Sequence, residues 1–346
     1  MNIINTGTPR AGSLTKPWRF FSRKPAILGA AERGRGYTPT VSEIAEDYLL
    51  SRRGQMKRST CSTYTTIIIK HLEPEFGSTP IDRVKLEEIS DFLYKKSFPE
   101  QGEALSASTL RGIITVLRAI FQYAESCGYS VAGWKSITWP TKSTSPTQVL
   151  TEEEQRTLRE HLCSDVTCEK LGILTCMYTG LRIGEICAMK WGDISFETGI
   201  MTVKRTVQRI KNPEYRDGSG ESRTKVIFDV PKSRNSVRCI PIPSFLLALM
   251  EEHRRPDNCF LLSGREDVYM EPRLLQNHYR TIMRNAGVEY VNFHALRHTF
   301  ATNCVNLGFD VKTLSEILGH SDVSITLNTY VHPSMDVMKS FMERLK

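Results

Sequence analysis

The sequence has no apolar run that approaches the length of a membrane-spanning helix. Its N-terminal part also lacks the apolar core of a signal peptide, because the stretch 26–31 is short and contains a glycine. Nine cysteines are present, but no two of them are spaced as C-x-x-C. These absences indicate a cytoplasmic protein with reduced thiols, and they argue against a membrane protein or a disulfide-bonded secreted one.

A zinc site is incomplete in this sequence. His294 and His298 are four residues apart, as in the helix of a zinc protease, but Ala295 stands where that helix carries its glutamate. No third ligand lies at a convincing distance from the pair. We therefore expect no metal ion in this protein.

What the sequence does have is length and an excess of basic residues. Its 346 residues are enough for two domains, and 46 Lys and Arg against 38 Asp and Glu give a net charge of +8. A basic balance favours an anionic partner such as nucleic acid. In residues 1–36, basic residues are interleaved with aromatic ones. We expect a flexible segment there, with the alternative that it grips DNA phosphates.

Pattern and composition divide the chain into regions. Four helical patterns without a strand pattern predict a small helical domain. A stretch rich in Thr, Ser and Pro follows, and helical patterns around three strand-like ones then predict an α+β domain. The predicted regions are a basic segment at 1–36, a helical domain at 37–142, a linker at 143–149 and an α+β domain at 150–346.

In the helical domain, Thr40 and Glu43 form a capping box that opens the first helix. The second helix is predicted over 59–72 and is expected to end at Pro74, and the clearest apolar stripe spans 110–124. Four basic residues of this domain are candidates for contact with DNA phosphates: Lys57, Arg58, Arg111 and Arg118.

In the α+β domain, Thr151 and Glu154 make a second capping box. Alternating patterns predict strands over 200–210, 225–230 and 237–242. The long polar segment between the first two strands predicts a flexible hairpin. Lys232 lies in the tight connection between the last two.

The stretch 294–330 predicts three short helices with polar residues at their ends. His294 and Arg297 are three residues apart and share a helical face. His320 falls just past a glycine that is expected to end the second helix in the left-handed conformation. Tyr330 lies on the third helix. Donors, cations and a tyrosine from these helices predict a convergent polar site.

Five motifs stand in order along the chain: TGLRIGE, PKSRNSVRCIPI, HALRH, LGH and NTY. Each alone is weak, but five in this order at suitable separations are specific. The sequence therefore resembles the tyrosine recombinase family, the phage-type integrases and their relatives, over about residues 40–346. The resemblance implies a mainly α fold with a small β-sheet, in which a helical SAM-like core-binding domain precedes an α+β catalytic domain.

The resemblance also implies roles for individual residues. Arg182 matches the family's first arginine, Glu185 its supporting acid and Lys232 its hairpin lysine. His294 and Arg297 match the His-x-x-Arg pair, His320 matches the position held by His or Trp, and Tyr330 matches the nucleophile. No catalytic position departs from the family pattern. By contrast, we interpret His298, His278, Trp191, Cys187 and Cys304 as structural residues.

These residue types suit strand cleavage by transesterification. Arg182 and Arg297 would hold the oxygens of a phosphorane-like transition state, and His320 would add a hydrogen bond. A tyrosine with a pKa near ~10 needs help to attack, so we expect positive charge to lower that pKa and His294 to accept the proton. Lys232 would protonate the leaving 5′ oxygen. The product would be a 3′-phosphotyrosyl link, made without cofactor or metal.

The resemblance implies a site-specific recombinase or integrase that acts on duplex DNA for a mobile element. The alternatives are a DNA relaxase of the type IB topoisomerase class and a catalytically decayed DNA-binding protein. Expected partners are specific double-stranded DNA sites, further copies in a homo-tetramer on synapsed DNA and an accessory directionality factor, in the cytoplasm and without a membrane. Residues 335–345 are expected to form an apolar helix that docks into the next protomer.

Overall fold

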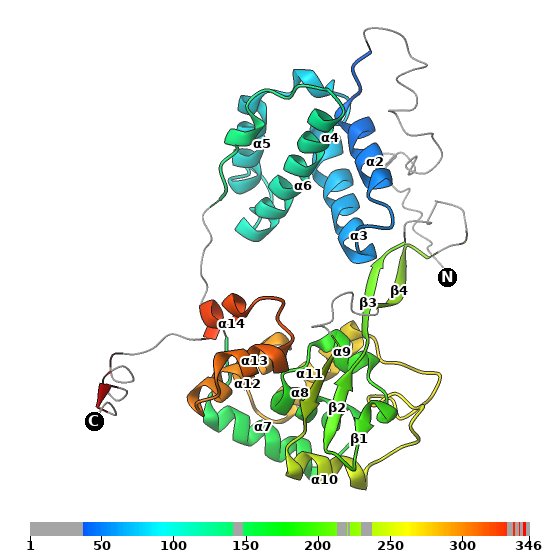
Figure 1. The fold of residues 1–346 in the computed structure, drawn as a ribbon, viewed down its shortest axis with the longest axis vertical. Coiled ribbons are helices and arrows are strands. Elements are labelled where there is room, and N and C mark those ends of the chain that lie inside the picture. Colours follow the sequence, from blue (N-terminus) through cyan, green and yellow to red (C-terminus); the bar gives the residue numbers. More distant parts are fainter. Residues whose placement is uncertain are drawn as a thin grey trace, which may run out of the picture. The chain divides into compact units, whose positions relative to one another are not determined.

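The computed structural model describes residues 37–140, 148–212, 220, 222–229 and 237–330, and positions 335, 339, 342 and 343. The chain divides into two compact units (Figure 1). The first contains Met1–Thr144 and Ile210–Lys225, and the second contains Ser145–Arg209 and Val226–Lys346. No helix within the described ranges is long and apolar enough to cross a membrane.

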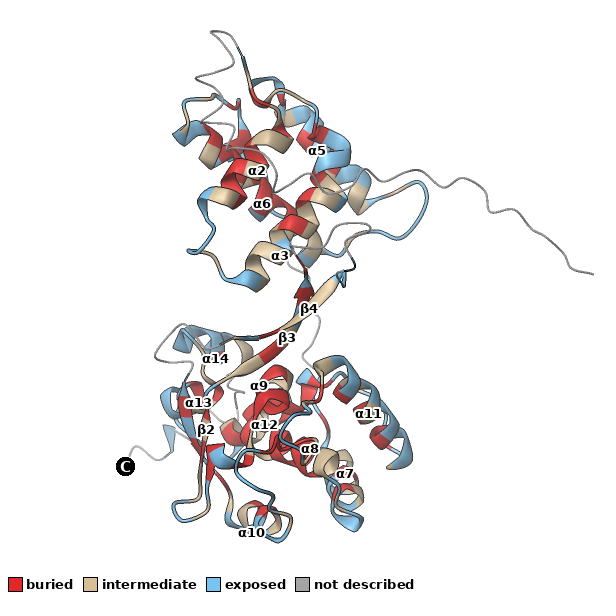
Figure 2. Cartoon of the chain, turned by 90° about the vertical axis from the view of Figure 1, so that its right-hand side faces the viewer, coloured by how far each residue is buried: buried red, intermediate tan, exposed pale blue. Residues whose placement is uncertain are grey.

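The first unit is a bundle of helices around α6, whose apolar stripe is buried. Figure 2 shows this stripe and the facing side of α2 in the colour of buried residues. The predicted capping box of Thr40 and Glu43 is confirmed at the start of α2. In chain order the helices are α2 (Val41–Ser51), α3 (Arg58–Ile67), the π-helical η1 (Ile68–Leu72), α4 (Glu73–Phe76), η2 (Ile81–Arg83), α5 (Leu86–Ser97), α6 (Ala107–Ser126) and η3 (Trp134–Ser136).

The prediction that the second helix ends at Pro74 is wrong. After α3 the chain widens into the π-helical turn η1, and α4 then begins at Glu73 and continues to Phe76. Pro74 is therefore the second residue of α4, directly after a π-helical turn that accommodates a residue without a backbone N–H. The buried side chains of Ile68, Leu72 and Phe76 explain why the chain keeps turning, because all three contribute to the core of this unit.

The second unit is mainly helical with two small sheets, which confirms the predicted fold class. Its elements are α7 (Glu152–Ser164), α8 (Cys168–Thr179), α9 (Ile183–Ala188), η4 (Trp191–Asp193), β1 (Ile194–Ser195), β2 (Ile200–Val203), β3 (Thr206–Lys211), β4 (Thr224–Asp229), β5 (Arg238–Pro241), α10 (Ser244–Glu252), α11 (Pro272–Asn285), α12 (His294–Asn306), α13 (Val311–Leu318) and α14 (Val323–Tyr330). The parts of β3 and β4 that fall within Ile210–Lys225 are counted in the first unit. One sheet has the order β1-β2-β5, with both pairs antiparallel, and the other pairs β3 with β4.

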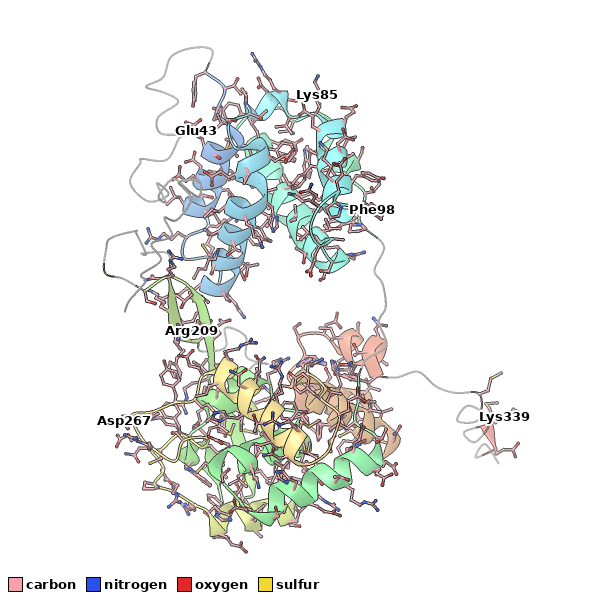
Figure 3. The ribbon with its side chains drawn as sticks, turned by 180° about the vertical axis from the view of Figure 1, so that it is seen from behind. Glu43, Lys85, Phe98, Arg209, Asp267 and Lys339 are labelled. Atoms are coloured by element: carbon pink, nitrogen blue, oxygen red, sulfur yellow. The ribbon has the colours of Figure 1, made fainter. Side chains whose placement is uncertain are left out.

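The single strand predicted over 200–210 is two strands in two sheets. The break between β2 and β3 falls at Lys204 and Arg205, whose side chains both pair with the buried carboxylate of Asp193. Successive side chains of a regular strand point to opposite faces, so two neighbours that reach one carboxylate require a bend. Beyond it, Arg209 of β3 (labelled in Figure 3) donates from Nε to Glu271 at 2.8 Å, just before α11.

Helix α8 lies at the centre of the second unit and carries eight buried residues out of twelve. Helices α7, α11 and α12 pack against it. The predicted capping box of Thr151 and Glu154 is confirmed at the start of α7. Trp191, Cys187 and Cys304 are buried as expected of structural residues. The three short helices predicted over the C-terminal stretch are α12, α13 and α14, and they pack on one another.

Candidate active site

Two left-handed glycines shape the site. Helix α8 ends at Gly180, with φ of 63°, and α13 ends at Gly319, with φ of 65°. Both helices therefore stop abruptly and turn their last carbonyl groups inward. There is no room for a side chain at either position: a Cβ on Gly180 would lie 2.6 Å from the ring of Phe300, and one on Gly319 would lie 2.9 Å from Cδ of Arg238.

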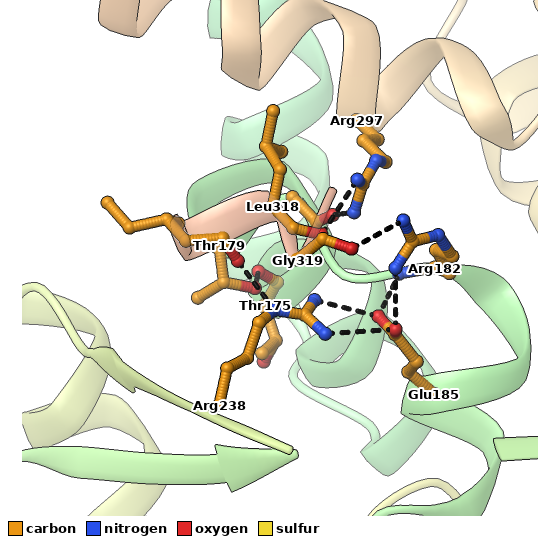
Figure 4. Close-up of polar contacts among 10 residues, drawn as sticks. Thr175, Thr179, Arg182, Glu185, Arg238, Arg297, Leu318 and Gly319 are labelled. Atoms are coloured by element: carbon orange, nitrogen blue, oxygen red, sulfur yellow. Dashed lines mark hydrogen bonds and ion pairs between the residues drawn. The ribbon is translucent and has the colours of Figure 1, made fainter. Parts of the chain in front are cut away.

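Three arginines from separate elements meet the C-terminal end of α13 (Figure 4). Arg238 of β5 donates from Nε to the carbonyl of Ile317 at 2.6 Å, and Arg297 of α12 donates from Nη2 to that of Leu318 at 2.8 Å. Arg182, just before α9, donates from Nη2 to the carbonyl of Gly319 at 3.2 Å. Three successive carbonyls at the negative end of the helix dipole thus accept from three guanidinium groups.

Arg297 is also bonded to the other helix end, because its Nη1 lies 2.8 Å from the carbonyl of Gly180. Its side chain is almost fully buried, with 2% of the residue exposed. Burial, followed by repulsion from Arg182, lowers the pKa of Arg297 to about 9, so the guanidinium is still charged at neutral pH.

Glu185 links two of the arginines. Its carboxylate receives both terminal nitrogens of Arg238, at 3.0 and 2.9 Å, and Nη1 of Arg182 at 2.9 Å. It also accepts the backbone N–H of Arg182 at 2.8 Å. Burial opposes its ionisation, but the bonds and charge of Arg238 and Arg182 dominate and hold its pKa at about 2. Glu185 is therefore an ionised support for the arginines.

Arg238 is a site residue that sequence reasoning missed. The signal was its place in strand β5, where Arg238 and Ile240 are buried while Cys239 and Pro241 are exposed. A charged residue on the inward face of a strand needs a buried partner, and Glu185 is that partner. The three guanidiniums share this one carboxylate among the described residues, so the cluster keeps a positive excess that suits a phosphate group.

His320 follows the end of α13 and is tied to α14. Its Nδ1 lies 2.7 Å from the hydroxyl of Thr326, a fully buried residue. Burial, and then the charges of Arg297, Arg182 and Arg238, lower the pKa of His320 to about 4. The ring is therefore neutral near pH 7. If the threonine hydroxyl donates to Nδ1, the proton of the imidazole is on Nε2, where it can be donated to a ligand.

Tyr330 ends α14, and its hydroxyl lies 2.8 Å from Nδ1 of His298 on α12. Burial raises the pKa of Tyr330, and the charges of Arg297 and Arg182 oppose that rise without cancelling it. We expected positive charge to lower this pKa, but desolvation of the phenolate is the larger effect. The tyrosine hydroxyl therefore remains protonated at neutral pH.

His294 and His298 lie on one side of α12. Their rings meet edge to face, with centroids 4.6 Å apart. Burial, followed by the charges of His298, Arg297 and Arg182, lowers the pKa of His294 to about 4, although part of its surface is exposed. The histidine bonded to the tyrosine is His298, which the sequence led us to interpret as structural. The i, i+4 spacing of the two histidines was the feature that could have revealed it.

Other predicted site residues lie elsewhere. Lys232 falls outside the described residues. Lys57 and Arg58 are exposed at the start of α3. Arg111 donates from Nε and Nη2 to the carbonyl of Pro140, at 3.1 and 2.9 Å, and Arg118 donates to the carbonyls of Lys135 and Ile137 and packs over the ring of Trp139. Phosphate contact by these four basic residues stays a prediction. His278 pairs with Glu169. Among the described residues, no group of His, Cys, Asp and Glu is arranged to hold a metal ion.

Comparisons with known proteins identify the class. The family model described as "Phage integrase family" matches residues 148–336, and that described as "Phage integrase, N-terminal SAM-like domain" matches residues 40–97. The first match alone covers more than half of the chain. The chain thus belongs to the phage integrase family of tyrosine recombinases, which confirms the resemblance seen in its motifs.

A similar relative is described as "Tyrosine recombinase XerC-like", from Caldanaerobacter subterraneus subsp. tengcongensis. It is 33% identical over 262 residues, which make up 69% of this chain and 65% of the relative, so the chain spans slightly less than two thirds of its length.

A solved structure of the Tn1549 transposon integrase with circular intermediate DNA is 22% identical, with a TM-score of 0.72 over 89% of this chain and 100% of that one. A lambda integrase tetramer bound to a Holliday junction is 17% identical, with a TM-score of 0.61 over 88% and 80%. Both structures share the fold.

Proposed function

We propose that this protein is a site-specific DNA recombinase or integrase that cleaves and rejoins duplex DNA through a 3′-phosphotyrosyl intermediate on Tyr330. The observation that carries the proposal is that Tyr330 bonds His298, the residue next to Arg297 of the arginine cluster, within one unit of one chain. The charges of Arg297 and Arg182 act on the tyrosine oxygen, so nucleophile and phosphate-binding groups converge. Family membership supports the same activity.

The proposed role of Arg182 and Arg297 is to bind the scissile phosphate. A guanidinium has five N–H donors, and the bonds to carbonyls and to Glu185 leave further donors on each side chain for phosphate oxygens. Both arginines are held in place by hydrogen bonds before DNA arrives, and Arg297 is also buried. Fixed positive charge stabilises the extra negative charge of a phosphorane-like transition state at little cost in reorganisation.

The remaining roles follow from chemistry. His320 donates a hydrogen bond from Nε2 to a phosphate oxygen, and Glu185 orients Arg182. As the Tyr330 oxygen bonds to phosphorus, the bond to the 5′ oxygen breaks. That oxygen takes a proton, for which we propose Lys232 as donor. His294, beside the cluster, remains a proposed catalytic residue. The phosphotyrosyl link keeps the energy of the broken bond, so no cofactor or metal is required.

For DNA binding, we propose that the helical domain at 37–142 and the catalytic domain at 150–346 both contact the duplex backbone, joined by the linker at 143–149. The exposed pair Lys57 and Arg58 is the stronger candidate for phosphate contact in the helical domain. Arg111 and Arg118 would have to share donors with carbonyls that they already bind. Residues 1–36, outside the described ranges, are a candidate for additional backbone contacts.

The biological setting is proposed on the relatives. One structural neighbour is the Tn1549 transposon integrase, which supports integration or excision of a mobile element. Another neighbour was solved as a tetramer on a Holliday junction, which supports a homo-tetramer on synapsed DNA. The expected docking helix at 335–345 lies almost wholly outside the described residues. An accessory directionality factor and a cytoplasmic location complete the proposal.

The experiment that tests this function traps the covalent intermediate. Nicked suicide duplexes, drawn from sequences flanking the gene and from a randomised library, are incubated with wild type and with Tyr330→Phe. The expected result is a protein–DNA adduct that survives denaturing electrophoresis with wild type and is absent with Tyr330→Phe. Salt-sensitive DNA binding by both proteins, without an adduct from any duplex, would contradict the proposal and favour a binding protein.

The duplexes that give an adduct then separate strand exchange from relaxation. A recombinase joins strands from two partner duplexes and produces joint molecules. A relaxase of the type IB topoisomerase class removes supercoils from a plasmid that carries one site and produces no joint molecules. We expect joint molecules, whose formation rises steeply with protein concentration because several protomers must assemble.

A further inference from the structure

We propose that His298 is the proton acceptor for the Tyr330 hydroxyl during strand cleavage. This inference rests on the proposed function and assigns a residue of the same site. It differs from the assignment suggested by the family pattern, in which His294 takes this proton. The juxtaposition that carries it is the hydrogen bond between α12 and α14, in which Nδ1 of His298 and the tyrosine oxygen lie 2.8 Å apart.

Geometry favours His298 over its neighbour. A general base must lie within about 2.6–3.2 Å of the atom whose proton it removes, and His298 meets that distance before any substrate binds. Its ring centroid is 5.6 Å from that of Tyr330. On the other side, its ring is packed edge to face against His294. Two ring contacts and one hydrogen bond therefore fix the orientation of the imidazole.

The protonation states also suit this role. Burial, and then the charge of Arg297, lower the pKa of His298, so its ring is neutral at pH 7 and one nitrogen carries a lone pair. Tyr330 keeps its proton because burial raises its pKa. The hydrogen bond therefore runs from the tyrosine O–H to Nδ1 when the ring proton is on Nε2. The charged and titratable groups that act on the pair are His294, Arg297 and Arg182.

Arg297 completes the arrangement from the residue just before His298. Its positive charge favours the phenolate form of Tyr330. The phenolic oxygen can thus give its proton to His298 beside the positive charge of Arg297. Negative charge that develops on the oxygen during proton transfer is stabilised by a guanidinium that is itself held by two carbonyls.

The step balances as follows. The Tyr330 oxygen forms its bond to phosphorus, the bond from phosphorus to the 5′ oxygen breaks, and the tyrosine proton moves to Nδ1 of His298. The leaving 5′ oxygen receives a different proton from the acid proposed above. In the rejoining step a 5′ hydroxyl attacks phosphorus and gives its proton to the deprotonated form of that acid, the tyrosine oxygen leaves, and the His298 imidazolium returns its proton to the tyrosine. Repulsion between this imidazolium and Arg297 favours the return.

A purely structural role for His298 makes a different prediction, and asparagine separates the two. The side-chain amide of His298→Asn places a polar atom near the position of Nδ1 and can bond the tyrosine, but it does not take a proton near neutral pH. His298→Ala removes both functions. His278→Asn is the matched control, because His278 is a partly exposed histidine on α11 that pairs with Glu169 away from the cluster.

The measurement is the single-turnover rate of adduct formation between pH 5 and 9, on a duplex that the wild type cleaves. We expect His298→Asn to be slower by about 100-fold or more and to lose the acidic limb of the wild-type profile, because general base catalysis contributes 10²–10⁴-fold. His278→Asn should match wild type. An asparagine variant within threefold of wild type, with the same acidic limb, overturns the proposal.

A readout independent of turnover tests the hydrogen bond itself. In protein labelled with ¹⁵N-histidine, the signal of His298 is the one absent from His298→Asn. We expect it to report an unprotonated Nδ1 at pH 7 and to shift in Tyr330→Phe. A protonated Nδ1 overturns the assignment. If no duplex gives an adduct with wild type, the proposed function fails and takes this proposal with it, whereas a wild-type adduct with an unimpaired asparagine variant removes only the role of His298.

Discussion

Arginines are used in both units of this molecule, and the two uses differ. In the first unit, Arg111 and Arg118 of α6 donate to carbonyls of the segment that follows α6, and no carboxylate of the described residues joins them. In the second unit, Arg182, Arg238 and Arg297 come from three separate elements and meet at one helix end, and Arg182 and Arg238 share one buried acid.

The difference shows two roles for arginine: Arg111 and Arg118 stabilise a local segment of chain, whereas the second cluster is suited to bind phosphate. Arg111 and Arg118 fasten the stretch after η3 to the helix that precedes it, within about thirty residues of chain. The second cluster concentrates charge from residues more than a hundred positions apart, in a place where burial makes that charge costly. Buried charged side chains whose orientation is fixed by hydrogen bonds are typical of functional sites, although their burial costs free energy. From the sequence, the family motifs assigned Arg182 and Arg297 to the site, Arg111 and Arg118 were candidates for phosphate contact, and Arg238 was not singled out.

The largest effect on adduct formation should come from replacing Arg182 or Arg297 of the second unit by lysine. Arg182→Lys and Arg297→Lys keep the charge but lose donors to carbonyl, carboxylate and phosphate. We expect adduct formation at saturating DNA to slow by about 10²–10³-fold, as for loss of one preorganised donor. Arg118→Lys is the control and should stay within threefold. Equal losses in both units would break the comparison.

The next largest effect should be on the stability of the second unit, when the buried Glu185 of its arginine cluster is replaced. Glu185→Gln leaves Arg238 buried, with 7% of the residue exposed, without its ionised partner. We expect the free energy of unfolding of the second unit to fall by about 3–5 kcal/mol, measured by chemical denaturation. Glu153→Gln, which removes an exposed pair with Arg156 on α7, should leave the transition nearly unchanged. Similar effects of the two variants would show that burial of the pair is unimportant.

The same acid predicts a dependence on pH. Its folded pKa of about 2 lies below the ordinary value of 4.5, so its stabilisation is complete above pH 4.5 and is lost as the pH falls toward 2. The wild type should lose about 3 kcal/mol more than Glu185→Gln across that window. Denaturation midpoints of both proteins at pH 5, 4, 3 and 2 measure this. Parallel curves would mean that another carboxylate governs acid unfolding.

A smaller effect, on the local stability of the first unit, is expected when Arg118 is replaced. Arg118→Ala removes donors to two carbonyls and the packing of its guanidinium over Trp139. Such contacts contribute about 1–2 kcal/mol together. Hydrogen exchange in the intact chain should become faster in α6 and in the segment after η3, with unchanged exchange in α12 and α13. Increased exchange in both units would contradict a local role.

The smallest effect concerns the exposed pair at the start of α3. Lys57→Gln and Arg58→Gln should each reduce the slope of log K against log salt by about one, with little change in stability. Fluorescence anisotropy on one duplex between 50 and 300 mM salt measures the slope. An unchanged slope in both variants would remove these residues from the DNA contact and return attention to Arg111 and Arg118.

Local rules accounted for what could be predicted. The capping boxes at Thr40 and Thr151 and the helix ends at Gly180 and Gly319 depend on residues three or four apart, so the sequence alone predicts them. The roles of Arg182, Arg297 and Tyr330 rested on family motifs in a fixed order.

What could not be predicted depends on long-range contacts. The partnership of Arg238 with Glu185 joins residues 53 positions apart, and that of His298 with Tyr330 joins residues 32 apart. Spacing within one element can single out Arg238 or His298, but it does not identify the partner of either residue. The balance between burial and positive charge at Tyr330 was also misjudged, because burial is a property of the packed unit. The prediction that the second helix ends at Pro74 was wrong for a local reason, because a π-helical turn precedes Pro74 and the helix continues after it.

The end of α13 has a consequence for how this protein tolerates insertions and deletions. Each residue added to or removed from a helix rotates everything beyond it by about 100°. One such change within α13 would swing three carbonyls away from three arginines at once, and would displace His320 with them. Exposed positions such as Lys312 and Glu316 can vary in identity while the eight-residue length of α13 cannot. In a comparison of many relatives, this helix should therefore vary in composition and not in length.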